Sequence, residues 1–392
     1  MRNVVIVAGC RTPIGTIGGQ FKTITSLDLS IPVMQNLLKR SGVNPESIED
    51  VIWGCNYQRT YKENNLARVA AVKAGLPVTV PGITIHRNCT SSMSAIQMGF
   101  YQIKAGEADC IMAGGADSMS TAPHMVFNAR YGQKYGHMEM RDSMWDSLTN
   151  LGVGPAMGIT AENVADKYNI TREQMDAYSL RSQQRAVAAI DAGRFEEEII
   201  PITVSSRKGD KVYTVDEYPK RDATLEGLAK LKPAFKEGGK VTAGNASGMN
   251  DAASGVILME EEKAKELGMP IIARVVSVAT TGVEPELMGI GPISATNKAL
   301  DKAGLTIDDI DLFEINEAFS SQCLACQKEL KIPDDKLNVN GGGISLGHPV
   351  GATGSRIVIS LMYEMKRRGN RYGIATLCAG GGMGTAVLIE MV

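Results

Sequence analysis

The sequence lacks a dominant charge. Its 392 residues carry 41 Lys and Arg against 43 Asp and Glu, which gives a formal net charge of −2. Proteins that bind nucleic acid or anionic membrane surfaces usually show a basic excess. We therefore expect neither partner, and an anionic ligand must be met by local basic groups.

Long apolar runs without a break are also missing. The least charged stretch, residues 372–392, has Glu390 as its one charged residue, and a group of glycines between 380 and 384 interrupts it. This pattern predicts two buried strands around a tight turn and not a membrane span. Residues 1–7 lack the features of a signal or transit peptide, and seven cysteines, an odd number, indicate free thiols in a reducing compartment. We expect a soluble, cytoplasmic protein.

Motifs for a resident metal or cofactor are weak. No G-x-G-x-x-G follows the first apolar strand, which argues against a nicotinamide cofactor. Cys323 and Cys326 form a C-x-x-C pair, but they lie in a helical pattern with no second pair, so zinc is not expected. Residues 343–347 match G-x-S-x-G, yet their surroundings do not fit the strand-to-helix elbow of hydrolases. We expect no metal and no permanently bound cofactor.

Short apolar runs alternate with longer helical patterns, which is typical of an α/β fold. One strand, over residues 109–113, is expected to end at Gly114-Gly115. The other strands are predicted at residues 3–8, 50–53, 82–85 and 312–315, and helices over 27–40, from Cys89 to near Gly106, and over 172–192.

A degenerate internal repeat relates the two halves of the chain. Residues 44–53 resemble 305–314, and residues 104–115 resemble 368–381. In the second half the partner strand follows at once, at 384–390, whereas its counterpart, 254–260, comes after a long interval. The sequence therefore predicts a duplicated α/β fold. Its expected parts are 1–118 plus 249–271, an inserted domain 119–248, and 272–392.

Two cysteines stand where chemistry is plausible. Cys89 separates a predicted strand from a helix that begins with Thr90, and the partial positive charge at a helix N-terminus lowers a thiol pKa and favours thiolate. Cys378 ends an apolar strand just before Gly380, whose amide could face a developing oxyanion. Each could equally be an inert cysteine of the core.

Two polar residues occupy comparable positions. His348 lies in a glycine-rich loop, residues 341–354, and could act as base for a thiol elsewhere in the fold. A structural loop histidine is the alternative. Asn316 follows the strand at 312–315, at the end of a sheet where ligands tend to bind, although it could be only a helix N-cap.

Six phrases occur in this order: Arg11-Thr12-Pro13-Ile14-Gly15, Cys89-Thr90-Ser91-Ser92, Asn245-Ala246-Ser247-Gly248-Met249-Asn250-Asp251, Asn316-Glu317-Ala318-Phe319, Gly347-His348-Pro349-Val350-Gly351-Ala352-Thr353-Gly354 and Cys378-Ala379-Gly380-Gly381-Gly382-Met383-Gly384. Together they resemble the thiolase family, and the likeness spans essentially the whole chain. Length and phrasing are most similar to the bacterial acetyl-CoA acetyltransferases. The resemblance implies a layered αβαβα fold with an inserted loop domain.

The resemblance also implies an acyl transfer. His348 would take the proton of Cys89, whose thiolate attacks a thioester or ketone carbonyl to give an acyl-enzyme. Cys378 would move the proton on the α-carbon, and Asn316, through a water, would polarise the enolate oxygen together with His348. The amides of Cys89 and Gly380 would form an oxyanion hole. The expected reaction condenses two acetyl-CoA to acetoacetyl-CoA or reverses this; the alternative is cleavage of longer 3-ketoacyl-CoA.

Coenzyme A thioesters are the implied substrates. Lys220 and Arg221 are candidates for contact with the CoA phosphates. A homotetramer assembled partly through residues 119–140 is also implied. The expected binding residues along the CoA tunnel are Ser247, Met157, Met288, Phe235 and Phe319.

The sequence departs from the family pattern near the expected site. His86 stands where Asn is usual, and Ala156 where a bulky or imidazole side chain is usual. The phrase that begins at Cys89 is closer to degradative, longer-chain thiolases. These departures leave the acyl-chain length open. A non-catalytic acyl-CoA binder or a decarboxylating ketosynthase would be expected to lack part of the set Cys89, His348 and Cys378.

Overall fold

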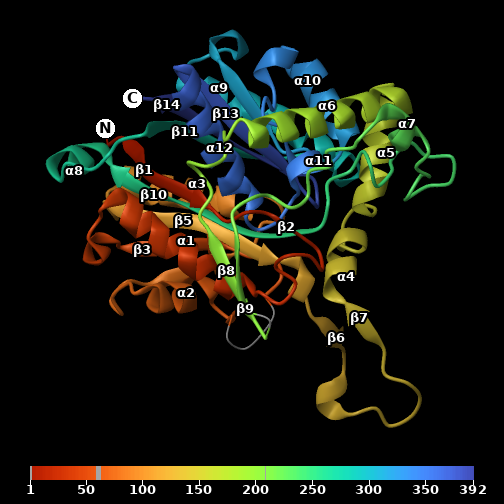
Figure 1. Ribbon diagram of the computed structural model, residues 1–392, viewed down its shortest axis with the longest axis horizontal. Helices are drawn as coiled ribbons and strands as arrows, with labels where there is room; N and C mark the ends of the chain where they lie inside the picture. Colours follow the sequence, from red (N-terminus) through yellow and green to blue (C-terminus); the bar gives the residue numbers. More distant parts are fainter. Residues whose placement is uncertain (1, 59–62, 208) are drawn as a thin grey trace.

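The computed structural model describes residues 2–58, 63–207 and 209–392 (Figure 1). Its centre is a ten-stranded mixed sheet with the order β12-β13-β14-β11-β1-β10-β5-β3-β4, in which β2 pairs with β10. The bounds are β1 Val4–Arg11, β2 Gly15–Thr16, β3 Asp50–Gly54, β4 Gly82–Ile85, β5 Cys110–Ser118, β10 Asn250–Glu260, β11 Ala273–Gly282, β12 Leu312–Ile315, β13 Tyr372–Ala379 and β14 Met383–Met391.

The strands form two matching sets that meet where β11 pairs with β1. From the β1–β11 contact outward, β10, β5 and β3 on one side correspond to β14, β13 and β12 on the other. In both sets the central strands pair antiparallel and the outer ones parallel. Short 3-10 turns at Pro45–Ser47 and Ile307–Asp309 precede β3 and β12, as the repeat predicts.

Helices form three layers around this sheet. Helices α3 and α12 pack against each other in the middle, α1 and α2 cover one outer face, and α9 and α10 cover the other. Left-handed glycines end several of these helices, which lets the last carbonyls be satisfied. The bounds are α1 Ser26–Ser41, α2 Leu66–Ala74, α3 Ser91–Ala105, α8 Glu261–Glu266, α9 Gly291–Ala303, α10 Ser320–Leu330, α11 Gly343–Leu346 and α12 Thr353–Arg368.

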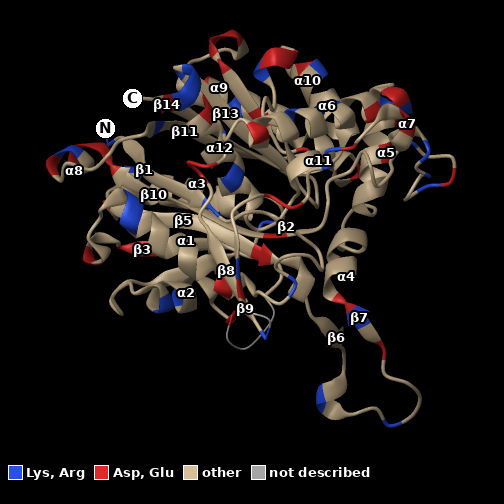
Figure 2. Ribbon diagram, viewed as in Figure 1, with Lys and Arg blue, Asp and Glu red and all other residues tan. Residues whose placement is uncertain are grey.

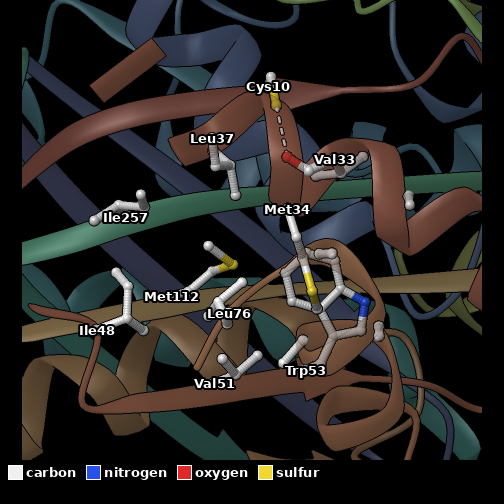
Figure 3. Close-up of a cluster of buried hydrophobic side chains, with 14 of the residues drawn as sticks. Cys10, Val33, Met34, Leu37, Ile48, Val51, Trp53, Leu76, Met112 and Ile257 are labelled. Atoms are coloured by element: carbon white, nitrogen blue, oxygen red, sulfur yellow. Dashed lines mark hydrogen bonds between the residues drawn. The ribbon is translucent and has the colours of Figure 1, made fainter. Parts of the chain in front are cut away.

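Separate apolar cores hold the layers together. The cluster under α1 includes Trp53, Met112 and Ile257 from three adjacent strands (Figure 3). The Trp53 indole N–H donates to Ser30 Oγ at 3.0 Å, so this buried ring leaves no polar atom unsatisfied. The central cluster joins α3 and α12 to both sets of strands, and a third lies under α9 and α10. The predicted duplicated, layered α/β fold is confirmed.

The chain between β5 and its neighbour β10 forms the predicted insertion. An arm made by β6 and β7 extends away from the body (Figure 1). The β8–β9 hairpin packs against the apolar cluster under α1, where Tyr213 contacts Phe21. No helix of the described residues is long and apolar enough to cross a membrane. The bounds are β6 His124–Val126, β7 Met140–Asp142, α4 Ser143–Thr149, α5 Met157–Lys167, α6 Arg172–Asp191, β8 Ile202–Ser206, β9 Gly209–Tyr213 and α7 Leu225–Ala229.

One predicted boundary is wrong. The strand expected at 109–113 does not stop at the two glycines but continues to Ser118 as β5. A Cβ on Gly114 would collide with the backbone of Ser254, and one on Gly115 with the backbone of Gly351. These glycines permit close approach of neighbouring chain segments and do not mark a turn.

Candidate active site

Cys89 stands on a tight turn between β4 and α3, which we call the Cys89 turn (residues 86–90). Asn88 has a left-handed φ of 45°, and the amides of Thr90 and Ser91 donate back to the carbonyls of Arg87 and Asn88, both at 3.1 Å. A Cβ on Gly54 would come within 2.7 Å of Ser91 Cβ, so the end of β3 must be bare for this turn to fit. The fold therefore presents Cys89 at the N-terminal end of α3.

The expected thiolate is not the resting state. Burial raises the pKa of the half-buried Cys89 to about 11, and the charge of Asp117 acts in the same direction. The amides of Gly380 and of Cys89 itself oppose this rise. The prediction that the helix terminus alone lowers the pKa of Cys89 is wrong, because desolvation outweighs it. A base is needed to remove the proton.

His348, the residue predicted to be that base, is oriented by a hydrogen-bond chain. Its Nδ1 lies 2.6 Å from Thr353 Oγ1, and the same hydroxyl donates to the Pro349 carbonyl at 2.8 Å. Since the hydroxyl proton is used there, the oxygen accepts from Nδ1–H, and the network assigns the free lone pair to Nε2. Burial lowers the pKa of His348 to about 3, with the charge of Arg356 acting in the same direction. The imidazole is neutral and can accept a proton.

Asn316 lies beside the basic nitrogen of His348. Its Nδ2 is 3.5 Å from His348 Nε2. Asn316 Oδ1 is buried and, among the described residues, has no hydrogen-bond partner. An unsatisfied buried amide oxygen costs free energy unless a water or ligand reaches it. The neighbouring Glu317 fixes this strand end by accepting from Tyr178, Ser182, Asn338 and the Ile344 amide.

Cys378 and Gly380 face the same centre from the second half. Cys378 is fully buried at the end of β13, and burial raises the pKa of its thiol well above the ordinary value, with the charge of Cys89 adding to the rise. Asn88 Nδ2 donates to the Gly380 carbonyl at 2.7 Å, which turns the Gly380 amide toward the Cys89 turn. At rest, both sulfurs keep their protons.

The two halves meet where α3 and α12 begin. The Ser355 amide of α12 donates to Ser92 Oγ of α3 at 2.9 Å. Gly354 lies so close to the backbone of Met93 that a Cβ there would collide with it. This crossing places the loop that carries His348 against Cys89, and Val350 from that loop contacts Cys89 in a small apolar cluster. Of the predicted residues, the structure brings Gly380 and Cys378 to Cys89 and pairs Asn316 with His348.

The residues expected along a CoA tunnel mostly gather in one apolar cluster that also contains Cys378. Phe235 and Phe319 lie edge to face with ring centroids 6.4 Å apart. Met288 is buried in the cluster with Phe319, and Met157 packs against it and against Gly380. The amide of Ser247 donates to the Ala318 carbonyl at 2.9 Å, which places it at the edge of this cluster.

Lys220 and Arg221 line a surface pocket against α6 instead. The pocket has a volume of about 260 Å³ and includes Gln183 and Asp191. Arg221 makes a two-pronged ion pair with Asp191, at 2.7 and 3.0 Å, in an exposed position. A phosphate would have to compete with Asp191 for that guanidinium.

The two departures lie close to the site. His86 is exposed at the start of the Cys89 turn, and Ala156 is the N-cap of α5, next to Met157. Leu151 lies within the same wall, because a Cβ on Gly380 would come within 2.7 Å of its side chain.

Three residues that hold the site were missed by sequence reasoning. Thr353 fixes the His348 tautomer, and Asn250 accepts from the His348 amide at 2.9 Å. Asp117 is a fully buried carboxylate bonded to loops of both halves. The signal in the sequence was an acidic residue two positions after the glycine pair Gly114-Gly115, where the strand was expected to have ended. Together the site offers a thiol, a neutral imidazole and facing amides, which suit acyl transfer through a covalent intermediate.

Comparisons with known proteins agree with this chemistry. The family described as "Thiolase, N-terminal domain" matches residues 4–262, and "Thiolase, C-terminal domain" matches residues 269–391. An acetyl-CoA acetyltransferase of Syntrophomonas wolfei is 50% identical, with 99% of each chain covered. Among solved structures, the acetyl-CoA acetyltransferase of Bacillus anthracis has a TM-score of 0.98 at 49% identity, covering 100% of this chain and 99% of the other.

A second solved structure resembles the chain nearly as closely. Human mitochondrial 3-ketoacyl-CoA thiolase in complex with CoA has a TM-score of 0.96 at 44% identity, with 100% of this chain and 98% of the other covered. The relatives therefore include both acetyl-CoA acetyltransferases and a 3-ketoacyl-CoA thiolase.

Proposed function

The chain belongs to the thiolase family and is an acyltransferase, and from this premise we propose that Cys89 carries the acyl group. The observation that carries the proposal is the hydrogen-bond chain from Pro349 through Thr353 to His348, which leaves Nε2 as a base in a site whose nucleophile is protonated at rest. A neutral imidazole beside a thiol is the arrangement that nucleophilic catalysis requires.

The first half of the cleavage direction breaks the carbon–carbon bond. Cys89 Sγ attacks the 3-keto carbonyl of acetoacetyl-CoA while His348 Nε2 takes the thiol proton. The amides of Cys89 and Gly380 stabilise the oxyanion; each such donor contributes about 3 kcal/mol. When the bond breaks, Cys89 keeps the acetyl group and the acetyl-CoA enolate leaves, taking the Cys378 proton on its α-carbon.

The second half of the thiolysis reaction restores the protons of Cys378 and Cys89. The Cys378 thiolate takes the thiol proton of an incoming CoA, whose sulfur attacks acetyl-Cys89. Cys89 leaves and recovers its proton from His348, and acetyl-CoA departs. The enolate oxygen is stabilised by the Nε2–H of His348 and by a water that bonds to Asn316, whose Oδ1 has no partner among the described residues. Condensation of two acetyl-CoA is the same sequence reversed.

CoA lies along the apolar cluster in this proposal. Met157, Met288, Phe235 and Phe319 line the tunnel, with Ser247 near the pantetheine. Lys220 and Arg221 supply positive charge for the CoA phosphates from the neighbouring pocket. CoA is a substrate here, and the mechanism uses no resident cofactor.

The proposal extends to the domain limits, the compartment and the assembly. We propose domain limits at 1–118 plus 249–271, 119–248 and 272–392; the gap between the two family matches, residues 263–268, supports the start of the last one. We also propose a cytoplasmic homotetramer, with contacts through residues 119–140, because the β6–β7 arm exposes large apolar side chains.

A second substrate range is favoured by one observation. Ala156 has only a methyl group next to Met157, where a bulky side chain is usual in the family, so this wall leaves more room for an acyl chain. The human 3-ketoacyl-CoA thiolase has nearly the same fold. Thiolysis rates should be measured with 3-ketoacyl-CoA of four to sixteen carbons. A steep fall in kcat/KM beyond four carbons supports the acetoacetyl-CoA assignment, and comparable rates on long chains replace it with the degradative one.

A further inference from the structure

The buried carboxylate of Asp117 bonds directly to the loop that carries His348 and, through Asn56, is linked to the Cys89 turn. It lies near the end of β5 with no exposed surface. Its Oδ1 accepts from the amides of Asn56 and Tyr57, at 2.9 and 3.0 Å, in the segment that follows β3. Its Oδ2 accepts from the Gly351 amide at 2.6 Å, three residues after His348.

Asn56 extends this contact to the nucleophile. Its Nδ2 lies 3.1 Å from Asp117 Oδ2, 3.3 Å from the Asn88 carbonyl and 3.4 Å from Ser91 Oγ. Asn88 precedes Cys89 in its turn, and Ser91 begins α3 two residues after Cys89. One short chain of bonds thus runs from the Cys89 turn through Asn56 and Asp117 to the His348 loop (residues 347–352).

Asp117 must be ionised to make these contacts. Four N–H donors point at its two oxygens, and a protonated carboxyl would present a hydrogen to one of them. Burial raises the pKa of Asp117, and the backbone donors from Tyr57, Asn56 and Gly351 oppose the rise. Position 351 requires glycine, because a Cβ there would come within 2.8 Å of Asp117 Oδ2.

We propose that Asp117 is a positioning residue that sets Cys89 in register with His348 by holding both of their loops on one carboxylate. The proposal rests on Cys89 as the nucleophile. Asp117 has a second effect through its charge, since it stands near the Cys89 sulfur and disfavours thiolate there. The other titratable groups that face it are Cys55 at the end of β3 and Tyr57.

Substitution separates the two effects. Asp117→Asn removes the charge and replaces one carboxylate oxygen with an amide N–H₂ group. The N–H donors that bonded to that oxygen then face another donor and lose their acceptor. We expect kcat for acetoacetyl-CoA thiolysis to fall roughly 100-fold, since displacement of reacting atoms by about 1 Å costs that much, while KM for CoA stays unchanged. We also expect about tenfold more Cys89 thiolate at pH 9, measured at 240 nm as the difference from the same variant carrying Cys89→Ser.

Asn56→Ala keeps the charge and breaks only the link to the Cys89 turn. It should lower kcat roughly tenfold and leave the thiolate titration as in the native protein. The matched control is Asp216→Asn, which removes another buried carboxylate, bonded to Arg11 at 2.7 and 2.9 Å, away from these loops. It should lower stability without changing the Cys89 titration.

The outcomes decide between positioning and mere support of the fold. Native kcat per folded molecule in Asn56→Ala, or a native thiolate titration in Asp117→Asn, overturns the proposal. If Asp117→Asn does not fold, Asn56→Ala alone decides. Acetyl transfer to Cys89 in the native protein is measured separately; its absence would refute the nucleophile, whereas its presence with native-like variants would refute only the role of Asp117.

Discussion

At the residue scale, the site works through protonation states that burial sets. Cys89 and Cys378 stay protonated because burial raises the pKa of both thiols, and His348 stays neutral because burial lowers the pKa of its imidazole. A protonated Cys378 can act as acid at once, and a neutral His348 as base. These resting states suit both thiolysis and condensation, because either direction begins with the transfer of the Cys89 proton to His348.

The tautomer of His348 gives the first prediction. Thr353→Val removes the acceptor for Nδ1–H while keeping the shape of the side chain, so the imidazole loses its fixed orientation. We expect kcat for acetoacetyl-CoA thiolysis to fall roughly 10- to 100-fold, as for loss of partners that orient a functional histidine. Thr353→Ser keeps the hydroxyl and should retain most of the activity. Equal activity of the Val variant would contradict the assigned network.

At the scale of elements, the close crossing of α3 and α12 brings the two halves of the site together. Small residues make this possible, because Gly354 lies against the Met93 backbone and Gly115 against Gly351. The catalytic groups come from different repeats, so neither half could hold the complete site. The glycines of the His348 region thus permit close packing of the helices as well as close approach of a ligand.

This crossing gives the second prediction. Gly354→Ala puts a methyl group into the Met93 backbone and should lower the free energy of unfolding in urea by about 2 kcal/mol, the usual cost of overpacking. Activity per folded molecule should fall as well, since α12 positions His348. Gly227→Ala in the exposed helix α7, where the nearest atom is a Thr224 hydroxyl, is the control and should not destabilise. Two equally stable variants would argue against the crossing.

The elements that sequence reasoning located correctly share strong local signals. The predicted limits of β4 are those observed, and α1 and α6 lie within two residues of their predicted limits, because alternation, helical spacing and glycine caps mark them. The strand β5 was cut short because Gly114 and Gly115 resemble a turn when the partner backbone is unknown. Thiolate at Cys89 was expected because a helix terminus can be read from sequence, whereas desolvation depends on chain segments far away in the sequence.

The roles of Asp117 and Asn250 were missed for the same physical reason. Each acts by bonding a loop from another part of the fold, over separations of 234 residues for Asp117 and Gly351 and 98 for Asn250 and His348. Only the three-dimensional structure brings these partners together.

At the scale of the whole molecule, the β6–β7 arm exposes large apolar side chains to solvent. Its Tyr131 and Tyr135 are 89% and 94% exposed, and Phe127 and Met140 are exposed as well. Figure 2 shows charged residues of both signs spaced along the arm, with uncharged stretches between them. Apolar side chains extended from the body in this way are typical of a contact with another copy.

The arm gives the third prediction. Tyr131→Ser combined with Tyr135→Ser should reduce the mass measured by light scattering from that of a tetramer to that of smaller species, since aromatic anchors dominate such contacts. The fold of each subunit, followed by circular dichroism, should not change. Val78→Ser, at an exposed apolar residue elsewhere on the surface, should leave the mass as it is. A native protein that is already monomeric would contradict the proposed assembly.

Peptide mass spectrometry after incubation with acetyl-CoA shows whether Cys89 carries the acyl group. We expect one acetyl group, about 42 Da, on the peptide containing Cys89. CoA should remove it, and it should be absent in Cys89→Ala and slow to form in His348→Asn. An unmodified Cys89 in the native protein, together with full activity of Cys89→Ala, would refute Cys89 as the acyl carrier.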